Sequence, residues 1–274
     1  MQISKSQAAI ELLSRRKARK SIAEFATYID IPGAPVSDDD EEAEFKPIET
    51  RMVKHHRMIC DTMQGLMEGT IEHEGEVVRN AIICMPPGSA KSTYANVVAP
   101  AWAMGKYPGY NIITTSYGTP LALKQSRKTR NIIKQHKFNM LFNSCLTGDN
   151  ASVEDYSLTN DSTMRAAGIL AGVTGNRGDG VIIDDPLKGR EEADSQTIRD
   201  KIKAAIDDDL MTRLKPGGWV CYILTRWHDD DPVGRLLPDD YAGESGFFKC
   251  SDGETYYVLS LQAQCDREDD PPRS

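Results

Sequence analysis

The chain has 274 residues, of which 39% are hydrophobic and 27% charged, and its formal net charge is −8. This length suits one large α/β domain with small additions, and no apolar run approaches the ~20 residues that span a bilayer, so we expect no membrane partner. The net charge excludes a uniformly basic nucleic-acid coat, although a local basic strip can still bind DNA. The cysteines are scattered without a Cys-x-x-Cys pair, which favours reduced thiols over disulfides or a zinc site.

The first 44 residues are expected to form a helix and a loop outside the main domain. Residues 4–30 have the apolar spacing of a helix, and basic side chains gather on its opposite face. We interpret this basic face as solvated surface, with a phosphate or partner contact as the alternative. Residues 31–44 combine proline, glycine and an unbroken acidic run, which is typical of a polar loop.

The stretch from Asn80 to Thr93 carries the clearest chemical pattern. Residues 81–85 predict a short buried strand, and residues 86–90 predict a tight turn before a helix that opens with Lys91-Ser92. In a phosphate-binding loop the N–H groups of such a turn and the helix dipole face the phosphates, the lysine reaches the terminal phosphates and the serine binds magnesium. The candidate nucleotide-binding residues are Pro87, Gly88, Ser89, Ala90, Lys91, Ser92 and Thr93.

The usual form of this loop has two glycines, and this chain has Met85 and Ala90 in their places. By itself the stretch is therefore equally compatible with nucleotide binding and with an ordinary turn between a strand and a helix. Residues further along the chain have to decide between the two interpretations.

Residues 45–68 precede the loop, and their apolar side chains recur at steps of three and four, which predicts a helix. In nucleotide-binding folds the segment before the first strand often packs against the base. Phe45 and His56 are therefore candidates for an adenine pocket. His56 is equally compatible with an ordinary core or surface position, and nothing near it has the spacing of a metal site.

A strongly basic helix is predicted beyond the second strand. Residues 92–104 should be helical until Pro100 kinks or ends the helix, and the β-branched residues of 111–117 predict a strand. Residues 119–137 then predict a helix with six basic side chains and no acidic one: Lys124, Arg127, Lys128, Arg130, Lys134 and Lys137. Solvation alone explains such a face, but it also holds the best candidates for an arginine that acts on phosphate.

Two adjacent carboxylates end another apolar strand. Residues 143–170 indicate short strands and turns, and the glycine-rich stretch 172–180 leads into the strand at 181–186, which contains Asp184 and Asp185. A Walker B strand has this form, in which the first carboxylate helps to hold magnesium and the second polarises the attacking water. Acidic residues often occupy strand ends for other reasons, so the indication comes from the combination with the phosphate-binding loop.

The remaining elements indicate the fold class. Residues 191–214 carry an apolar side chain every four residues, which predicts an amphipathic helix on the core. Residues 219–224 predict a buried parallel strand ending at Thr225-Arg226, where α/β sheets bind ligands, and residues 256–261 predict a last strand. The alternation of strands and helices predicts an α/β fold with a mostly parallel sheet covered by helices on both faces.

Four segments in this order resemble the large terminase subunit of tailed bacteriophages, the motor that packages viral DNA. Residues 85–92, Met-Pro-Pro-Gly-Ser-Ala-Lys-Ser, resemble its Pro-Pro-x-x-Gly-Lys-Ser loop, and residues 116–122, Ser-Tyr-Gly-Thr-Pro-Leu-Ala, resemble its Ser-Tyr…Leu-Ala segment. Residues 174–188, with the Ile-Ile-Asp-Asp-Pro core, resemble its Walker B block, and residues 224–231, Leu-Thr-Arg-Trp-His-Asp-Asp-Asp, resemble its coupling motif. The resemblance implies a P-loop NTPase fold of the RecA-like type over residues 45–265.

The resemblance also implies a role for each matching residue. Lys91 would contact the β- and γ-phosphates of ATP, and Ser92 would bind Mg²⁺ together with Asp184. Asp185 would be the catalytic carboxylate, and Thr225 would sense the γ-phosphate and couple hydrolysis to DNA movement. The family has a glycine where this chain has Ala90, which leaves the tightness of the turn open.

Ring motors of this kind complete each site with an arginine from the neighbouring subunit. Arg127 and Arg130 in the basic helix are the candidates here, and Arg177 in the glycine-rich stretch is a third. The implied partners are double-stranded DNA, other copies of the chain in a homo-oligomeric ring, the portal protein and the small terminase subunit. The implied location is the host cytoplasm, with transient docking at the procapsid portal.

Full-length members of the family add a C-terminal nuclease domain. We expect residues 266–274 to be a tail or the start of a linker, and we expect no nuclease activity from this chain. Two other functions stay open on the sequence alone. A helicase of superfamily 2 shares the Walker pair, and a non-catalytic nucleotide-binding scaffold is compatible with the altered loop glycine.

Overall fold

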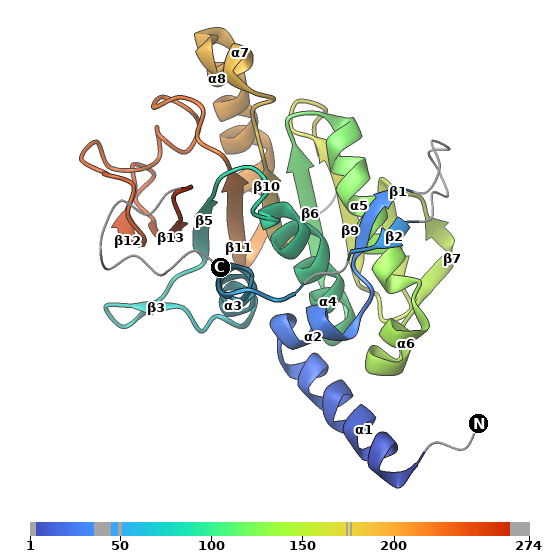
Figure 1. Ribbon diagram of the computed structural model, residues 1–274. Helices are drawn as coiled ribbons and strands as arrows, with labels where there is room; N and C mark the ends of the chain where they lie inside the picture. Colours follow the sequence, from blue (N-terminus) through green and yellow to red (C-terminus); the bar gives the residue numbers. More distant parts are fainter. Residues whose placement is uncertain (1–3, 36–44, 49–50, 174, 176, 264–274) are drawn as a thin grey trace.

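A nine-stranded sheet forms the centre of the computed structural model, which describes residues 4–35, 45–48, 51–173, 175 and 177–263 (Figure 1). The strand order is β12-β13-β5-β11-β10-β6-β9-β8-β7. In chain order the strands are β5 (Asn80–Cys84), β6 (Asn111–Ser116), β7 (Leu146–Ala151), β8 (Asp155–Leu158), β9 (Thr163–Gly168), β10 (Gly178–Asp184), β11 (Leu214–Leu224), β12 (Gly246–Lys249) and β13 (Thr255–Ser260). Strands β13, β5, β11, β10, β6 and β9 are parallel, which confirms the expected mostly parallel sheet.

The central strands carry a separate hydrophobic core on each face of the sheet, because successive side chains of a strand point to opposite sides. On β5, Ile83 packs into one core and Ile82 into the other. The first core also takes side chains from α1 (Lys5–Lys20), α2 (Ile22–Tyr28), α3 (Lys54–Glu68), η1 (Thr93–Val98), α4 (Ala99–Lys106), α5 (Thr119–Ile133) and α6 (His136–Phe142). The second takes them from α7 (Arg190–Asp194), α8 (Gln196–Ala204) and η2 (Ala205–Leu210).

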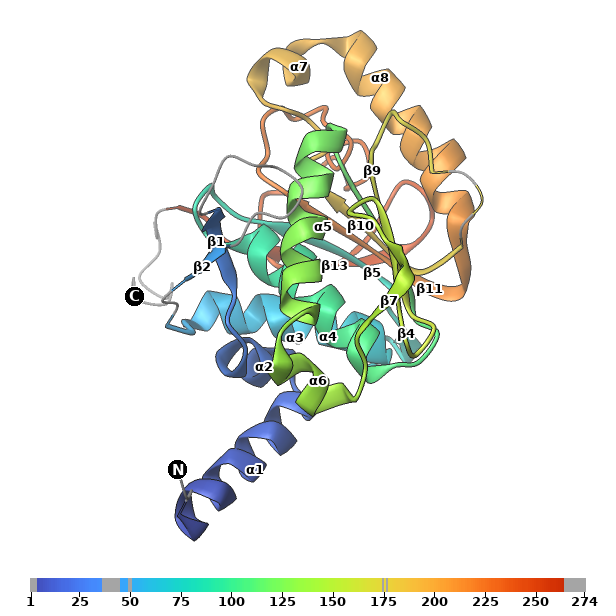
Figure 2. The same cartoon turned by 90° about the vertical axis from the view of Figure 1, so that its right-hand side faces the viewer.

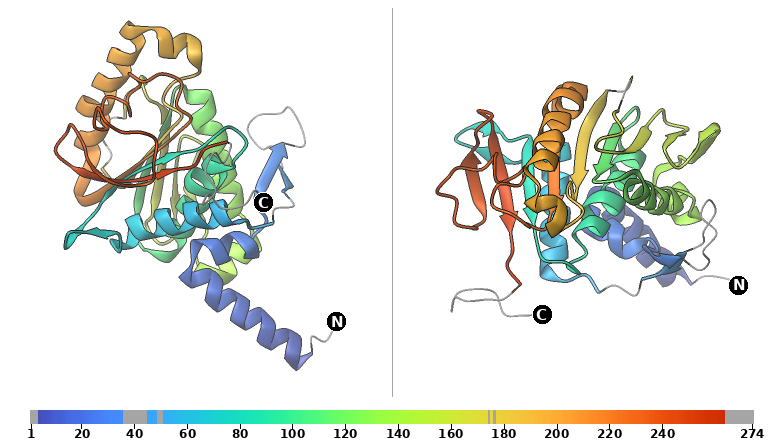
Figure 3. Two further views of the ribbon diagram at one scale, coloured as in Figure 1. Left: turned by 60° about the vertical axis from the view of Figure 1, so that its left-hand side comes forward. Right: turned by 90° about the horizontal axis from the view of Figure 1, so that it is seen from above.

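Two small hairpins and a projecting helix complete the arrangement. The hairpins are β1 (Pro32–Pro35) with β2 (Phe45–Pro47) and β3 (Glu72–His73) with β4 (Glu76–Val77). Helix α1 extends away from the sheet, and α7 and α8 lie at the opposite end of the molecule (Figures 2 and 3). Among the described residues, none of the helices is long and apolar enough to cross a bilayer.

The first two expected helices are shorter than the apolar spacing indicates. The helix expected over residues 4–30 is interrupted at Ser21, whose hydroxyl accepts a hydrogen bond from the Glu24 N–H and so caps α2. The helix expected over residues 45–68 begins only at Lys54, because residues 45–47 pair with β1. This pairing also makes residues 32–35 a strand, whereas residues 36–44 of the expected acidic loop and the expected tail from residue 266 lie outside the described residues.

Three later predictions also need correction. The helix at residues 93–106 continues through Pro100, and its first six residues form a π-helix, which is common at functional sites. The helix expected over 191–214 is instead α7, α8, η2 and the short 3₁₀ turn η3 (Met211–Arg213), and β11 already starts at Leu214. The basic helix expected over 119–137 ends at Ile133, and α6 follows.

Candidate active site

Side chains from three separate segments meet where three neighbouring parallel strands, β5, β11 and β10, end. The Lys91 Nζ donates a hydrogen bond to the Thr225 Oγ1 at 3.0 Å, across 134 residues of sequence. The Ser92 Oγ donates to the Asp184 Oδ1 at 2.8 Å, across 92 residues. Carboxyl ends of adjacent parallel strands are where α/β sheets bind ligands, so these residues form the candidate active site.

The loop between β5 and η1 supplies the lysine and the serine. Gly88 has φ of +82° and Ala90 has φ of +59°, so both adopt the left-handed backbone conformation within three residues. Such conformations turn successive N–H groups towards one side and create an anion-binding concavity. For alanine this conformation costs roughly 1–2 kcal/mol, which glycine would not pay. Ala90 thus performs the turn that the usual glycine performs, at a cost in stability.

Asp184 is completely buried and accepts two hydrogen bonds. The first comes from Ser92, and the second comes from the Asn96 Nδ2 to Oδ2 at 2.9 Å. Asn96 is itself fixed by the Thr114 Oγ1, which donates to its Oδ1 at 2.6 Å. The sequence reasoning missed Asn96, although a polar residue four positions after Ser92 in an otherwise apolar helix was a usable signal. One helical face therefore presents both Ser92 and Asn96 to the carboxylate.

Burial changes the acidity of both carboxylates. Burial, and next the charge of the neighbouring Asp185, raise the pKa of Asp184 to about 7, although the hydrogen bonds from Asn96 and Ser92 oppose the rise. Burial also raises the pKa of Asp185, and the positive charge of Lys91 partly offsets this. Two adjacent carboxylates in a low-dielectric setting favour the uptake of a proton or a cation at this position.

Asp185 occupies a strained backbone position that the surrounding strands hold in place. Its φ is +45°, in the left-handed region. Its N–H donates to the Ile223 carbonyl at 2.7 Å, and its own carbonyl accepts from the Tyr117 N–H at 3.1 Å. Its Oδ1 accepts from the Thr225 N–H at 3.2 Å. Non-glycine residues held in such a conformation, at a cost of order 1–3 kcal/mol, are concentrated at functional sites.

Thr225 connects the loop after β11 with both of the other segments. Its hydroxyl donates to the Met85 carbonyl at 3.1 Å and accepts from Lys91, while its N–H binds Asp185. The following residues are also ordered by charge, since the Arg226 Nε donates to the buried carboxylate of Asp231 at 2.6 Å. Movement of Thr225 would therefore disturb the lysine and the catalytic candidate Asp185 together.

The residues present fit a magnesium nucleotide. Magnesium prefers oxygen ligands, and it is usually held by one or two carboxylates and by the phosphates of its substrate. Ser92 and Asp184 offer a hydroxyl and a buried carboxylate in direct contact. No group of three or more His, Cys, Asp or Glu side chains suited to a metal exists among the described residues.

The two adenine-pocket candidates lie in different places. His56 is buried and stacks on Tyr94 of the helix after the loop, with ring centroids 4.4 Å apart. Burial lowers its pKa to about 4. Because one face of the ring is covered by Tyr94, its position argues for support of the loop and against contact with adenine. Phe45 lies on β2 with the Lys128 Nζ 5.9 Å from its ring centre, and its role stays a prediction.

A cavity of about 700 Å³ lies beside the end of β5, between that strand and the segment after β11. Its lining contains Cys84, Arg226, Tyr241 and Ser260, but neither of the adenine-pocket candidates and none of the four residues that contact one another around Asp184 and Lys91. Asp185 and Thr225 border a second, much smaller hollow, whereas Ser92 and Asp184 are packed against each other at the strand end.

The three arginine candidates differ in accessibility. Arg130 is only 7% exposed, so its burial argues against a contact with a neighbouring subunit. Arg127 is partly exposed on the same helix, and its buried Nε has no hydrogen-bond partner among the described residues. Arg177 is exposed and precedes β10, so it lies at the opposite end of that strand from Asp184 of its own subunit. Arg127 and Arg177 are therefore the two candidates that a neighbouring subunit could contact.

Comparison with solved structures identifies proteins whose structures resemble this one. The large terminase of bacteriophage HK97 superposes with a TM-score of 0.50 at 12% sequence identity, over 81% of this chain and 46% of that protein. The ATPase domain of the large terminase of Thermus phage P74-26 gives a TM-score of 0.38 at 17% identity, over 60% of this chain and 68% of that domain. No protein-family model and no curated protein sequence matches the chain.

The likeness to the HK97 protein confirms, at the level of the fold, the P-loop NTPase architecture that the motifs led us to expect. The aligned region spans about half the length of the HK97 large terminase. Activity, substrates and partners therefore have to be argued from the residues of the site.

Proposed function

We propose that this chain hydrolyses ATP as the motor domain of a viral terminase large subunit, with residues 45–265 as the ATPase domain. The observation that carries the proposal is the contact of Lys91 with Thr225 and of Ser92 with Asp184 at adjacent strand ends. Lys91, Ser92 and Thr225 come from segments far from Asp184 in the sequence, and they meet it at the carboxyl ends of parallel strands, where α/β sheets bind ligands. A phosphate-binding loop, a Walker B pair and a strand-end threonine are the parts that phosphoryl transfer needs.

The chain's own residues divide the work as follows. The N–H groups of the loop from Pro87 to Thr93 surround the phosphates, and Lys91 neutralises charge on the β- and γ-phosphates. Ser92 and Asp184 would hold Mg²⁺, and the bound ion would supply positive charge that stabilises the phosphates. Asp185 orients a water molecule for attack on the γ-phosphorus and accepts its proton, while the bond to the β–γ bridging oxygen breaks and yields ADP and phosphate.

Thr225 contacts both Lys91, which would bind the γ-phosphate, and Asp185, which would orient the attacking water. In the structure its hydroxyl accepts a hydrogen bond from the Lys91 ammonium group, and a γ-phosphate oxygen would compete for that hydrogen bond. Arrival and departure of the γ-phosphate therefore change the partners of Thr225, and its N–H contact with Asp185 ties that change to the catalytic carboxylate. This is a physical basis for a residue that senses the state of the nucleotide.

The wider assembly follows from the proposed role. Copies of the chain would form a ring that moves double-stranded DNA into a procapsid, with Arg127 reaching the site of the next subunit. The portal protein and the small terminase subunit would be its partners in the host cytoplasm. The chain's net charge of −8 requires the DNA contact to be local, and the basic surface of α5 is its best candidate.

A strand-displacement experiment tests this motor role against helicase activity. A packaging motor should show ATP turnover that increases with duplex DNA, without separating the strands of a fluorescently labelled forked duplex. ATP-dependent strand separation would favour the helicase, and absence of turnover from the assembled protein would favour the scaffold. Lys91→Ala is the control, because it should remove any turnover that the site produces.

A further inference from the structure

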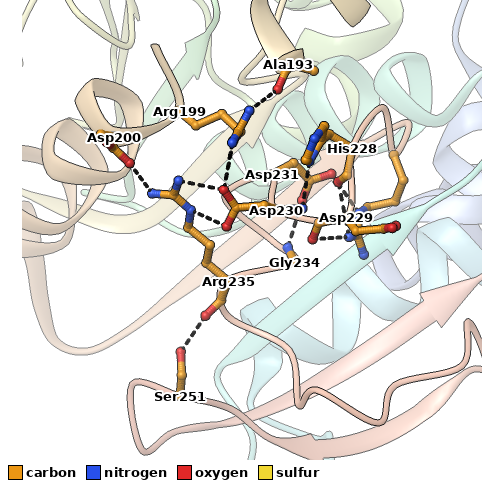
Figure 4. A network of polar contacts seen from close by, with 11 residues as sticks. Ala193, Arg199, Asp200, His228, Asp229, Asp230, Asp231, Gly234, Arg235 and Ser251 are labelled. Carbon is orange, nitrogen blue, oxygen red and sulfur yellow. Dashed lines mark hydrogen bonds and ion pairs between the residues drawn. The ribbon is translucent and has the colours of Figure 1, made fainter. Parts of the chain in front are cut away.

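Asp230 is held between two arginines beside the candidate active site (Figure 4). The Arg199 Nε and Nη2 both lie 2.9 Å from the Asp230 Oδ2. The Arg235 Nε donates to the Oδ1 at 2.7 Å, and its Nη2 donates to the Oδ2 at 2.8 Å. Hydrogen bonds between charged partners are stronger than neutral ones, and two guanidinium groups on one carboxylate fix its orientation.

Both arginines are anchored elsewhere as well. Arg199 belongs to α8, is buried, and donates from Nη1 to the Ala193 carbonyl. The Arg235 Nη1 donates to Asp200 of the same helix at 2.7 Å, and its carbonyl accepts from the Ser251 Oγ at 2.8 Å. The carboxylate of Asp230 therefore joins the segment after β11 to the helices after β10. We call this contact of Asp230 with Arg199 and Arg235 the arginine clamp.

Only four residues separate Thr225 from Asp230 of the clamp, and this segment is internally braced. The Asp230 N–H donates to the His228 Nδ1 at 2.9 Å (Figure 4), and the Arg226 Nη2 donates to the Asp229 carbonyl at 3.1 Å. Gly234 completes the turn, since a Cβ there would lie 1.8 Å from the Asp229 carbonyl oxygen. A displacement at Asp230 is therefore transmitted to Thr225 instead of being absorbed in a slack loop.

The clamp is the second of two contacts between the segments that follow β10 and β11. Strand β10 ends at Asp184 and leads into α7 and α8, which carry Arg199. Strand β11 ends at Leu224 and leads through Thr225 to Asp230. The two segments touch near the sheet, where Asp185 accepts from the Thr225 N–H, and they touch again at the clamp.

We propose that Asp230 is a positioning residue for the proposed reaction, which keeps the Thr225 hydroxyl in reach of Lys91 by fixing the 226–231 segment on α8. The inference rests on the proposed function. The plainer interpretation is a solvated ion pair without consequence, as exposed pairs usually are. It is disfavoured here because the Arg199 side chain is only 8% exposed, so that loss of Asp230 leaves a buried charge with fewer partners.

The ionisation of Asp230 is compatible with this role. Its hydrogen bonds to Arg235 and Arg199 hold the pKa of Asp230 at about 2. The groups that face the carboxylate, namely the two arginines, keep their charge throughout the working range of an enzyme. The clamp is therefore present at every pH at which the site would operate.

The first test compares Asp230→Asn with Asp155→Asn. The control removes the charge of another ion pair, since Asp155 lies 2.9 Å from Arg165 at the far side of the sheet. A displaced hydroxyl lowers kcat, and we expect a fall of about 10- to 100-fold in Asp230→Asn with KM for ATP within about threefold of wild type. Asp155→Asn should retain wild-type turnover. Unchanged kcat in Asp230→Asn, or a change confined to KM, would overturn the inference.

A double-mutant cycle shows whether Asp230 acts through Thr225. If it does, Asp230→Asn should cost little further turnover in a chain that already carries Thr225→Ala, because the group to be positioned is gone. Multiplicative losses would show that Asp230 acts by another route. The same cycle with Asp155→Asn provides the baseline for independent sites.

The fluorescence of Trp227 reports the position of the 226–231 segment independently of ATP turnover. This residue is 40% exposed, while Trp102 and Trp219 are buried, so acrylamide quenching of tryptophan fluorescence follows Trp227 selectively. Quenching should increase in Asp230→Asn and stay at the wild-type value in Asp155→Asn. Equal quenching in the two variants would contradict the clamp, even with activity lost. Failure of the wild-type protein to bind ATP would instead overturn the proposed function, so the two failures are distinguishable.

Discussion

The ammonium group of Lys91 donates a hydrogen bond to the hydroxyl of Thr225 at 3.0 Å, although the two residues lie 134 positions apart. A buried lysine needs a partner, and here the partner is the strand-end threonine that also binds Met85 and Asp185. The lysine is thereby held beside the strand end that carries Thr225. This pairing fixes the position of Lys91 although neither of the two usual loop glycines is present in this chain.

Ala90→Gly should stabilise the protein. The left-handed conformation costs alanine roughly 1–2 kcal/mol, and the added freedom of glycine in the unfolded chain returns about 0.4–1 kcal/mol of this, which leaves a net gain of about 0.5–1 kcal/mol. Denaturant unfolding measures it. Ala9→Gly, in the exposed part of α1, should instead lose roughly 0.5–1 kcal/mol. A loss of stability in both variants would show that Ala90 is not strained.

Asn96→Ala should destabilise the protein by about 1–3 kcal/mol, because the buried Oδ2 of Asp184 and the hydroxyl of Thr114 each lose their partner, although Ser92 still donates to the Asp184 Oδ1. Thr114→Val is the matched comparison. It removes only the bond to Asn96 and keeps the one to Asp184, so its effect should be smaller. Thermal unfolding of the two variants ranks them, and an equal or reversed order would contradict the position given to Asn96.

His56 should make the protein sensitive to acid. Its pKa is lowered to about 4 in the folded state, below its ordinary value of 6.5, so the unfolded state binds the proton more readily. The contribution of this group to stability is complete above pH 6.5 and is lost progressively as pH falls towards 4. In His56→Phe the free energy of unfolding should fall less steeply over this range. The same substitution at the exposed His136 controls for the loss of one histidine, and parallel profiles for His56→Phe and wild type would refute the prediction.

A further prediction distinguishes the roles of Arg127 and Arg130, which both belong to α5. Arg127→Ala should abolish ATP turnover in assembled rings while leaving nucleotide binding intact, because the group would act on the site of the next subunit. Arg130→Ala should act mainly on stability, since the side chain is buried within its own subunit. Turnover of the assembled protein and binding of a fluorescent ATP analogue measure the two effects. Full turnover in Arg127→Ala would direct attention to Arg177.

The sequence predicted the central strands and their carboxyl ends well, because short apolar runs such as 81–85 and 219–224 fit only a buried position in the sheet. It failed where one pattern suits two structures. The apolar repeat of Ile202, Ile206 and Leu210 is buried as expected, but it continues to Leu214, which already belongs to β11. The four basic residues of α5 gave no sign that Arg130 is buried among them, since a long side chain can enter the core by its stem.

The site was predicted in part for a similar reason. Lys91, Ser92, Asp184, Asp185 and Thr225 follow strands, and parallel strands bring their carboxyl ends together. The residues that orient these side chains do not follow strands in this way, so no sequence pattern reveals them. Arg199 and Asp230 lie 31 residues apart in separate elements, and only the packing of α8 against the segment after β11 brings them together.

Release of phosphate from ATP by the assembled protein tests the account most directly, measured for the wild type, Lys91→Ala and Asp185→Asn in the presence of Mg²⁺. We predict steady turnover in the wild type and its loss in both variants. Asp185→Asn should still bind ATP, because its carboxylate acts on the water and not on the phosphates. Wild-type turnover that survives in both variants, or no turnover in any of the three, would contradict an ATPase site at Lys91 and Asp185.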